Sequence, residues 1–313
     1  MSSSLHRLLY AAGLVLLALA LWVLIRQVGE IGAGNVLAAL RSERPDTVGL
    51  AAALVALNYF VLTFHDQLAV RYIGRRLSWW RVGATSFLGF AVSNSVGFGV
   101  FSGATVRFRF YSRWKVSGGE ISRIVAFYSS STVLGLAVIS GCSLAFDPPT
   151  ALTTLVPDLA LRLLGAALLT GVGAYLLVCV VRREPLRLWR FTLSLPSPGM
   201  SVGQVLISSV DWVLCASILY VLLPSPRPPF FELAGAFAGA QLAGIVSHVP
   251  GSLGVFESLM VLSLRGAVDA TRLLQALLLF RVLYYVVPFA IALAVIVIDG
   301  TFRRRTRRPA LAG

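Results

Sequence analysis

Ionisable side chains that interrupt long apolar stretches are the residues of this sequence best suited to chemistry. They are Asp66, Arg107, Arg109, Asp211, His248, Glu257 and Arg281. If the apolar stretches cross a membrane, each of these side chains is costly to bury and is therefore a functional candidate. Guanidinium groups suit phosphate, because arginine binds phosphate oxygens through paired hydrogen bonds. The expected chemistry is recognition of a phosphate-bearing lipid headgroup.

Asp66 and the two nearby arginines also have structural interpretations. Asp66 would pair with Arg71 or Arg75 at the membrane surface. Alternatively, it would face Arg107 or Arg109. Because these two arginines are two residues apart, they point in different directions on a helix. One would then contact the site while the other meets lipid phosphates, although the positive charge of cytoplasmic segments also explains both arginines.

Glu257 and Asp211 lie in apolar surroundings and each needs a partner of opposite charge. Arg281, inside the last apolar stretch, is the natural candidate. The sequence therefore predicts either a Glu257–Arg281 pair or an Asp211–Arg281 pair. Such a pair is as compatible with a structural role as with transport.

The stretch from Ser86 to Tyr111 is apolar, yet it is rich in glycine and small polar residues, among them Asn94 and Ser95. A lipid-facing helix would not contain so many of them, because bare backbone has no hydrogen-bond partner in hydrocarbon. Such backbone is tolerated where it folds back on itself or lines a cavity. The pattern predicts a re-entrant hairpin over 83–106, whose half-helix N-terminus would offer N–H groups to an anion.

The apolar stretch 231–264 is interrupted in a similar way. Pro250-Gly251 is a strong turn signal and marks the expected tip of a second hairpin. His248 and Glu257 flank this turn. We expect them to join the polar residues of the first hairpin in a lipid translocation site.

Catalytic motifs are weak in this sequence. It has three histidines, and it contains neither an H-E-x-x-H motif nor a metal-ligand cluster. We expect His65 at the membrane interface rather than acting as a base. The segment GSLG at 251–254 differs from the nucleophile motif G-x-S-x-G, and a turn explains its glycines. The sequence therefore predicts a protein that is not an enzyme and that holds no metal or cofactor.

The composition is that of a membrane protein, since 57% of the 313 residues are hydrophobic and 13% are charged, against about 25% charged in soluble domains. The net charge of +14 lies mostly in short loops, so topology and anionic lipids explain it better than nucleic acid does.

Ser117 and Glu120 have the spacing of a capping box that opens a helix. Full spans are predicted at 5–25, 47–70, 121–145, 159–181, 201–223 and 273–299.

Lysine and arginine are concentrated in alternate connections, which places both termini in the cytoplasm. By the same count, 83–106 enters and leaves from the cytoplasm and 231–264 from the opposite side. The expected fold is an all-α polytopic membrane protein with about six full spans and two re-entrant hairpins. Its single integral domain, 1–313, would comprise two inverted repeats, 1–146 and 158–313, as in many secondary transporters.

Three segments resemble a known family. They are HDQLAVRYIG at 65–74, SFLGFAVSNSVGFGVFSGATVRFRFY at 86–111 and VPGSLGVFE at 249–257. These segments are similar to the N-terminal transmembrane flippase domain of bacterial lysylphosphatidylglycerol synthase/flippases, and to the related stand-alone uncharacterised integral membrane family. The resemblance implies that the domain moves aminoacylated phosphatidylglycerol between leaflets. It also implies that Asp66 and Arg107 are functional and that the two hairpins form the translocation site.

The bifunctional members of that family continue into an aminoacyl-tRNA-dependent transferase domain, whereas this sequence stops at Gly313. We therefore expect a lipid flippase or transporter of the bacterial inner membrane, with aminoacylated phosphatidylglycerol as one candidate cargo. The alternatives are a non-transporting partner or anchor of a lipid-modifying enzyme, and an intramembrane lipid-linked transferase. The expected partners are the membrane and a phospholipid. A separate lipid-modifying enzyme and a second copy of the chain are further candidates, and nucleic acid is not expected.

Overall fold

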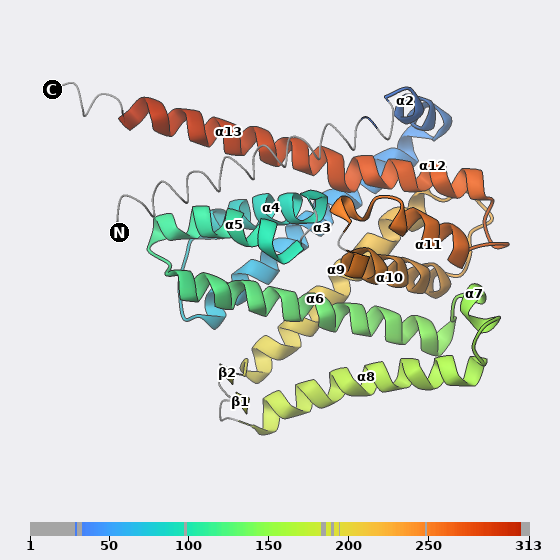
Figure 1. Ribbon diagram of the computed structural model, residues 1–313, viewed down its shortest axis with the longest axis horizontal. Helices are drawn as coiled ribbons and strands as arrows, with labels where there is room; N and C mark the ends of the chain where they lie inside the picture. Colours follow the sequence, from blue (N-terminus) through green and yellow to red (C-terminus); the bar gives the residue numbers. More distant parts are fainter. Residues whose placement is uncertain are drawn as a thin grey trace.

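The computed structural model describes residues 29, 33–96, 99–182, 186–188, 191–193, 195–247 and 249–307. The predicted first span, 5–25, lies outside these residues, and so does His248. The described part of the chain is built almost entirely of helices (Figure 1). The prediction of an all-α polytopic membrane protein is confirmed.

Within the described residues, six helices are long and apolar enough to cross a membrane. The mean hydropathy of their best windows is between 1.4 and 2.4, and at about 1.5 Å per residue even 18 residues extend about 27 Å. Five of the six coincide with predicted full spans, and the sixth, α10, is the first arm of the predicted second hairpin. They are α3 (Pro45–Tyr72), α6 (Gly118–Phe146), α8 (Asp158–Val181), α9 (Pro198–Leu222), α10 (Phe230–Ser247) and the continuous segment Ala270–Asp299.

The last of these segments changes its helical geometry near its centre. It begins as α12 (Ala270–Arg281), continues as the π-helix η3 (Val282–Val286) and ends as α13 (Val287–Arg307). Pro288 is the second residue of α13, two residues after the end of the π-helix. Proline has no N–H group, and its ring collides with the carbonyl four residues earlier, so it disturbs the regular helix at that point. The carbonyl concerned is that of Tyr284.

Each predicted hairpin is a pair of shorter helices. In the first, α4 (Trp79–Val96) and α5 (Gly99–Tyr111) lie side by side (Figure 1). In the second, α10 packs against α11 (Val255–Ser263) across the 3₁₀ turn η2 (Pro250–Ser252). Helix α5 has 13 residues and α11 has 9, so they are about 20 Å and 14 Å long. Both are shorter than the hydrocarbon core of a membrane, which is roughly 30 Å thick. How these pairs enter the membrane stays a prediction.

The tip of the second hairpin has the backbone geometry that its turn sequence predicts. Gly251, Ser252 and Gly254 have φ values of 61°, 52° and 78°, a region that favours glycine. Gly254 then precedes α11, and its backbone N–H donates to Glu257 Oε2 at 2.9 Å. The acidic residue thereby stabilises the start of α11.

The predicted capping box at the start of α6 is confirmed. Ser117 Oγ accepts from the Glu120 backbone N–H at 3.3 Å, and Glu120 Oε2 accepts from the Ser117 backbone N–H at 2.7 Å. Arg75 Nε lies 2.7 Å from the same Glu120 carboxylate. Because Arg75 follows α3, this contact fixes the end of α3 beside the beginning of α6.

Short elements occupy the remaining connections. The segment between the predicted first two spans contains helix α2 (Ala33–Ser42), which packs against α12. The 3₁₀ turn η1 (Ser112–Trp114) follows α5, and α7 (Thr150–Thr153) joins α6 to α8. The 182–200 connection contains an antiparallel pair of strands, β1 (Leu186–Leu188) and β2 (Phe191–Leu193). Leu188 pairs with Phe191 at the turn.

The long helices pack closely where small residues face each other. α3 packs along α9, and α6 packs against both α8 and α9. The order of a long helix, a hairpin of two helices and a further long helix occurs twice, first in α3 to α6 and then in α9 to α13. The inverted relation between the two halves stays a prediction.

Gly135 is a point at which α6 and α9 are too close for any side chain. A Cβ atom there would lie 2.6 Å from the Ser208 carbonyl oxygen. We expect Gly135→Ala to destabilise the purified protein by roughly 1–3 kcal/mol, because the backbones must separate. Gly171→Ala on α8 is the matched control, since nothing lies within 4 Å of its Cβ position, and alanine there should be neutral or stabilising. Thermal unfolding in detergent measures both, and equal melting temperatures would contradict the expectation.

Candidate functional site

Asp66 and Arg107 form an ion pair with no exposed surface. Arg107 Nε lies 3.1 and 3.0 Å from the two Asp66 carboxylate oxygens, and Nη2 lies 2.9 Å from Oδ1. Tyr111, one helical turn after Arg107, donates its hydroxyl proton to Asp66 Oδ2 at 3.0 Å. Both charged side chains are 0% exposed. The structure therefore brings Asp66 to Arg107 rather than to Arg71 or Arg75 at the surface.

The guanidinium of Arg107 lies between two aromatic rings. Its Cζ is 4.6 Å from the ring centroid of Phe90 and 4.2 Å from that of Tyr128, within the range of a cation–π interaction. Cβ atoms at Gly89 and Gly103 would lie 2.9 and 3.0 Å from Nη1. These two glycines leave the room that the guanidinium needs between α4 and α5. Nη1 itself has no hydrogen-bond partner among the described residues.

Arg109 points away from this pair, as its spacing from Arg107 predicts. Its side chain is partly exposed and lies 3.5 Å from Asp299 Oδ2 on α13. Arg113 binds the same carboxylate more closely, with Nη2 2.6 Å from Oδ2. One arginine of the predicted pair is therefore buried in the bundle, and the other belongs to a partly exposed cluster that joins the first hairpin to α13.

A second ion pair joins Arg281 on α12 to Glu257 on α11. The Arg281 guanidinium also donates to two carbonyl oxygens of the hairpin tip, Gly251 O at 3.0 Å and Ser252 O at 3.3 Å. One side chain thus holds both the tip turn and the acidic residue beyond it. Of the two pairings left open by the sequence, the structure contains Glu257–Arg281.

Asp211 lies instead in a buried network between α3 and α9. Asn58 Nδ2 donates to Asp211 Oδ1 at 2.7 Å and to the Asp211 backbone carbonyl at 3.1 Å. Asn58 Oδ1 accepts from the Tyr284 hydroxyl at 3.0 Å, and that hydroxyl accepts from Cys215 Sγ at 3.1 Å. His65 is also buried here, so the prediction that it lies at the membrane interface is wrong. Its position near the end of a span favoured the surface, but the surrounding helices cover the side chain.

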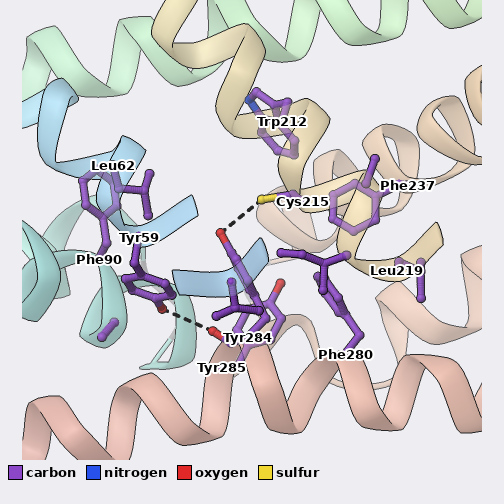
Figure 2. Close-up of a cluster of buried hydrophobic side chains, with 14 of the residues drawn as sticks. Tyr59, Leu62, Phe90, Trp212, Cys215, Leu219, Phe237, Phe280, Tyr284 and Tyr285 are labelled. Atoms are coloured by element: carbon purple, nitrogen blue, oxygen red, sulfur yellow. Dashed lines mark hydrogen bonds between the residues drawn. The ribbon is translucent and has the colours of Figure 1, made fainter. Parts of the chain in front are cut away.

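The π-helix η3 connects this network to the first hairpin. The Tyr284 carbonyl, which Pro288 leaves without its usual helical donor, accepts from the Tyr59 hydroxyl at 3.2 Å (Figure 2). The Tyr285 carbonyl accepts from Ser95 Oγ at 3.3 Å. Tyr284 and Tyr285 also belong to the buried aromatic cluster that Figure 2 shows between the helices. Departures from regular helix of this kind often occur at functional sites.

The predicted site residues thus do not gather in one place. Asn94 and Ser95 lie beside Tyr59 and Tyr285 respectively. The two ion pairs lie at the two hairpins, and Asp211 lies in the network between α3 and α9. Sequence reasoning missed Asn58, although a lone amide in an apolar span was a signal for it. It also missed the π-helix, for which Pro288 in the middle of a span was the signal.

Comparison with known proteins places this arrangement in a family. Residues 10–292 match the family described as the lysylphosphatidylglycerol synthase TM region. The chain is 34% identical to the "Uncharacterized protein slr0712" of Synechocystis, over 90% of this chain and 88% of that protein. It is 32% identical to the "Inner membrane protein YbhN" of Escherichia coli, over 78% of this chain and 77% of that protein.

A longer relative matches only in part. The chain is 26% identical to the phosphatidylglycerol lysyltransferase of Staphylococcus haemolyticus, over 74% of this chain but 27% of that protein. The match therefore concerns a minor part of the longer protein. The buried ion pairs and helical hairpins described above are those of a multi-pass membrane protein that belongs to the lysylphosphatidylglycerol synthase transmembrane-region family.

Proposed function

We propose that this protein is a lipid flippase of the bacterial inner membrane, with both termini in the cytoplasm, that moves a phospholipid between leaflets. Membership of the family supports this proposal. So do the names of two relatives, one an inner membrane protein and the other a transferase that acts on phosphatidylglycerol. Aminoacylated phosphatidylglycerol is one candidate cargo. In this proposal the chain moves the lipid and is not an enzyme.

The observation that carries the proposal is the arrangement of the two ion pairs. Each joins a hairpin to a long helix. In the first, the arginine lies on the hairpin and the acid on α3. In the second, the acid lies on the hairpin and the arginine on α12. Breaking either pair would expose a group of one sign on the hairpin and of the other sign on the helix, which suits a headgroup that carries both charges.

Transport would require the hairpins to move relative to the long helices. When Arg107 leaves Asp66, its guanidinium becomes free to bind a phosphate through two hydrogen bonds. Asp66 and Glu257 would then balance the charge of a cationic headgroup such as an aminoacyl amine. The partly exposed Arg109 and Arg113 would attract the phosphate at the membrane surface.

Leaflet exchange of a labelled phosphatidylglycerol in liposomes tests the proposal. We expect wild-type protein to exchange the lipid faster than empty liposomes do, and Arg107→Lys to lower the rate roughly tenfold, because an ammonium cannot replace the two-pronged guanidinium. Arg162→Lys is the matched control, since Arg162 forms an exposed pair with Asp158. Wild-type exchange no faster than in empty liposomes would overturn the proposal and favour a non-transporting membrane partner. An unchanged rate for Arg107→Lys would remove Arg107 from the site.

A further inference from the structure

The buried carboxyl of Asp211 lies close to the middle of α9 and faces α3. It is 8% exposed, and its strongest contact is with a neutral group, the Asn58 amide, at 2.7 Å. Cys215 Sγ lies 3.9 Å from the same oxygen, Oδ1. Unlike Asp66 and Glu257, Asp211 has no arginine partner among the described residues. An isolated carboxylate in such a place is strongly disfavoured.

The group that faces the other carboxyl oxygen is a histidine. His65 Nε2 lies 3.9 Å from Asp211 Oδ2, which is too long for a hydrogen bond. The histidine is 2% exposed, and its Nε2 has no hydrogen-bond partner among the described residues. A basic nitrogen and a carboxyl oxygen therefore face each other across a short gap. A proton bound to either group would remove the isolated negative charge, by neutralising the carboxylate or by placing a positive ring beside it.

The other groups around this gap do not supply a compensating charge. The titratable side chains that face Asp211 are Tyr59 of α3, Cys215 of α9 and Tyr284 of η3, and each is neutral in its ordinary state at physiological pH. The positive charge of Arg107 on α5 lies near His65, but the Asp66 carboxylate compensates that charge.

The other helices packed on this part of α9 meet it without adding a charge. The carbonyl of Thr132 on α6 accepts from the Trp212 indole at 3.0 Å. The ring of Phe237 on α10 lies 6.3 Å from that of Trp212. From α12, Phe280 packs against Phe237.

We propose that Asp211 and His65 form a site that binds one proton, and that the binding and release of this proton drive lipid movement by the two hairpins. This inference rests on the proposed flippase function. Chains of buried acidic and histidine residues serve as proton relays in other membrane transporters. The only bonds that change are those to the proton, which leaves water on one side, binds to the Asp211 carboxyl or the His65 ring nitrogen, and returns to water on the other side.

The contacts around the site connect it to both halves of the molecule. His65 is adjacent to Asp66, so a movement of this turn of α3 would also displace Asp66, and with it the ion pair to Arg107 on the first hairpin. Asn58 links Asp211 to the Tyr284 hydroxyl, and Tyr284 belongs to η3, which directly follows Arg281. Gaining or losing the proton changes the charge at the point where these connections meet.

Thermal unfolding of the purified full-length protein, measured between about pH 5 and pH 8, tests proton binding without any transport assay. The unfolded chain holds a proton on His65 until the pH rises through about 6.5, whereas the folded site keeps its proton to a higher pH, because losing it leaves a buried uncompensated charge. We therefore expect wild-type stability to fall as the pH rises above about 6.5. Asp211→Asn keeps the shape of the side chain but leaves His65 buried and neutral, so the stability of this variant should instead rise with pH up to about 6.5. Asp158→Asn, at an exposed carboxyl, should retain the wild-type dependence, and His65→Gln should alter it.

Lipid exchange in liposomes with and without a pH gradient tests the coupling. We expect the gradient to accelerate wild-type exchange roughly fivefold or more, and to leave Asp211→Asn unaffected. Wild-type exchange that does not respond to the gradient would overturn the coupling. Equal pH dependence of stability in wild type and Asp211→Asn would overturn the proton site. If wild-type protein moves no lipid at all, the flippase proposal fails, and the proton site is then decided by the stability measurement alone.

Discussion

Replacing Asp66 with leucine should destabilise the protein by roughly 3–5 kcal/mol, because Arg107 is then buried without an opposite charge. The arginine cannot turn toward water, since it has no exposed surface and lies between the rings of Phe90 and Tyr128. The Tyr111 hydroxyl loses its acceptor at the same time. In thermal unfolding, the apparent melting temperature should fall by on the order of 10 °C.

The double variant Asp66→Leu/Arg107→Leu separates stability from function. Replacing both members of a buried ion pair with apolar residues often restores stability, because no uncompensated charge remains. We therefore expect the double variant to melt well above the single variant, and close to wild type. Lipid exchange should nevertheless stay low, since the guanidinium proposed to bind phosphate is gone. Full recovery of exchange in the double variant would show that the pair is only structural.

A matched control comes from a pair in a different environment. Asp158 and Arg162 are four residues apart at the start of α8, and their side chains are 53% and 46% exposed. Because water screens such a pair, Asp158→Leu should change stability little. If Asp66→Leu and Asp158→Leu shifted the melting temperature equally, the buried pair would not have the importance that its geometry indicates.

Local patterns in the sequence predicted the helical elements well. Hydropathy located α3, α6, α8 and α9 to within a few residues. Glycine and small polar residues indicated the break between α4 and α5, because these residues are unfavourable in a lipid-facing helix. Pro250-Gly251 indicated the turn before α11. Each of these signals depends only on neighbouring residues, so a single sequence is sufficient to detect it.

Contacts between distant helices were harder to predict. The cost of burying charge pointed to a Glu257–Arg281 pair, and to Arg107 or Arg109 as the partner of Asp66. The same argument could not predict that the rings of Phe90 and Tyr128, from two other helices, enclose the Arg107 guanidinium. His65 was misplaced for the same reason, since hydropathy along α3 does not reveal which helices cover it. The sequence also made Asp211 a candidate, but its partner on α3 depends on how α3 crosses α9.

Replacing Arg281 with alanine should loosen the tip of the second hairpin. The guanidinium holds the Glu257 carboxylate and the carbonyls of Gly251 and Ser252, so its loss leaves three acceptors without their donor. Gly251 and Ser252 adopt positive φ values, and such backbone persists only where the surrounding contacts maintain it. Leaving buried acceptors unsatisfied costs roughly 1–3 kcal/mol. We therefore expect amide hydrogen exchange over 250–264 to become roughly tenfold faster or more.

Hydrogen exchange is the decisive measurement for Arg281, because it separates a local change from general unfolding. Exchange in α3 and α9 should stay as in wild type, while that of 250–264 increases. Arg272→Ala on the same helix, at an exposed side chain, is the matched control and should leave both regions unchanged. Arg281→Lys should give an intermediate result, since a single ammonium cannot reach all three acceptors in the geometry of the guanidinium. Unchanged exchange at 250–264 in Arg281→Ala would mean that the turn is stable by itself, and the Glu257–Arg281 pair would then lose its role in positioning the hairpin.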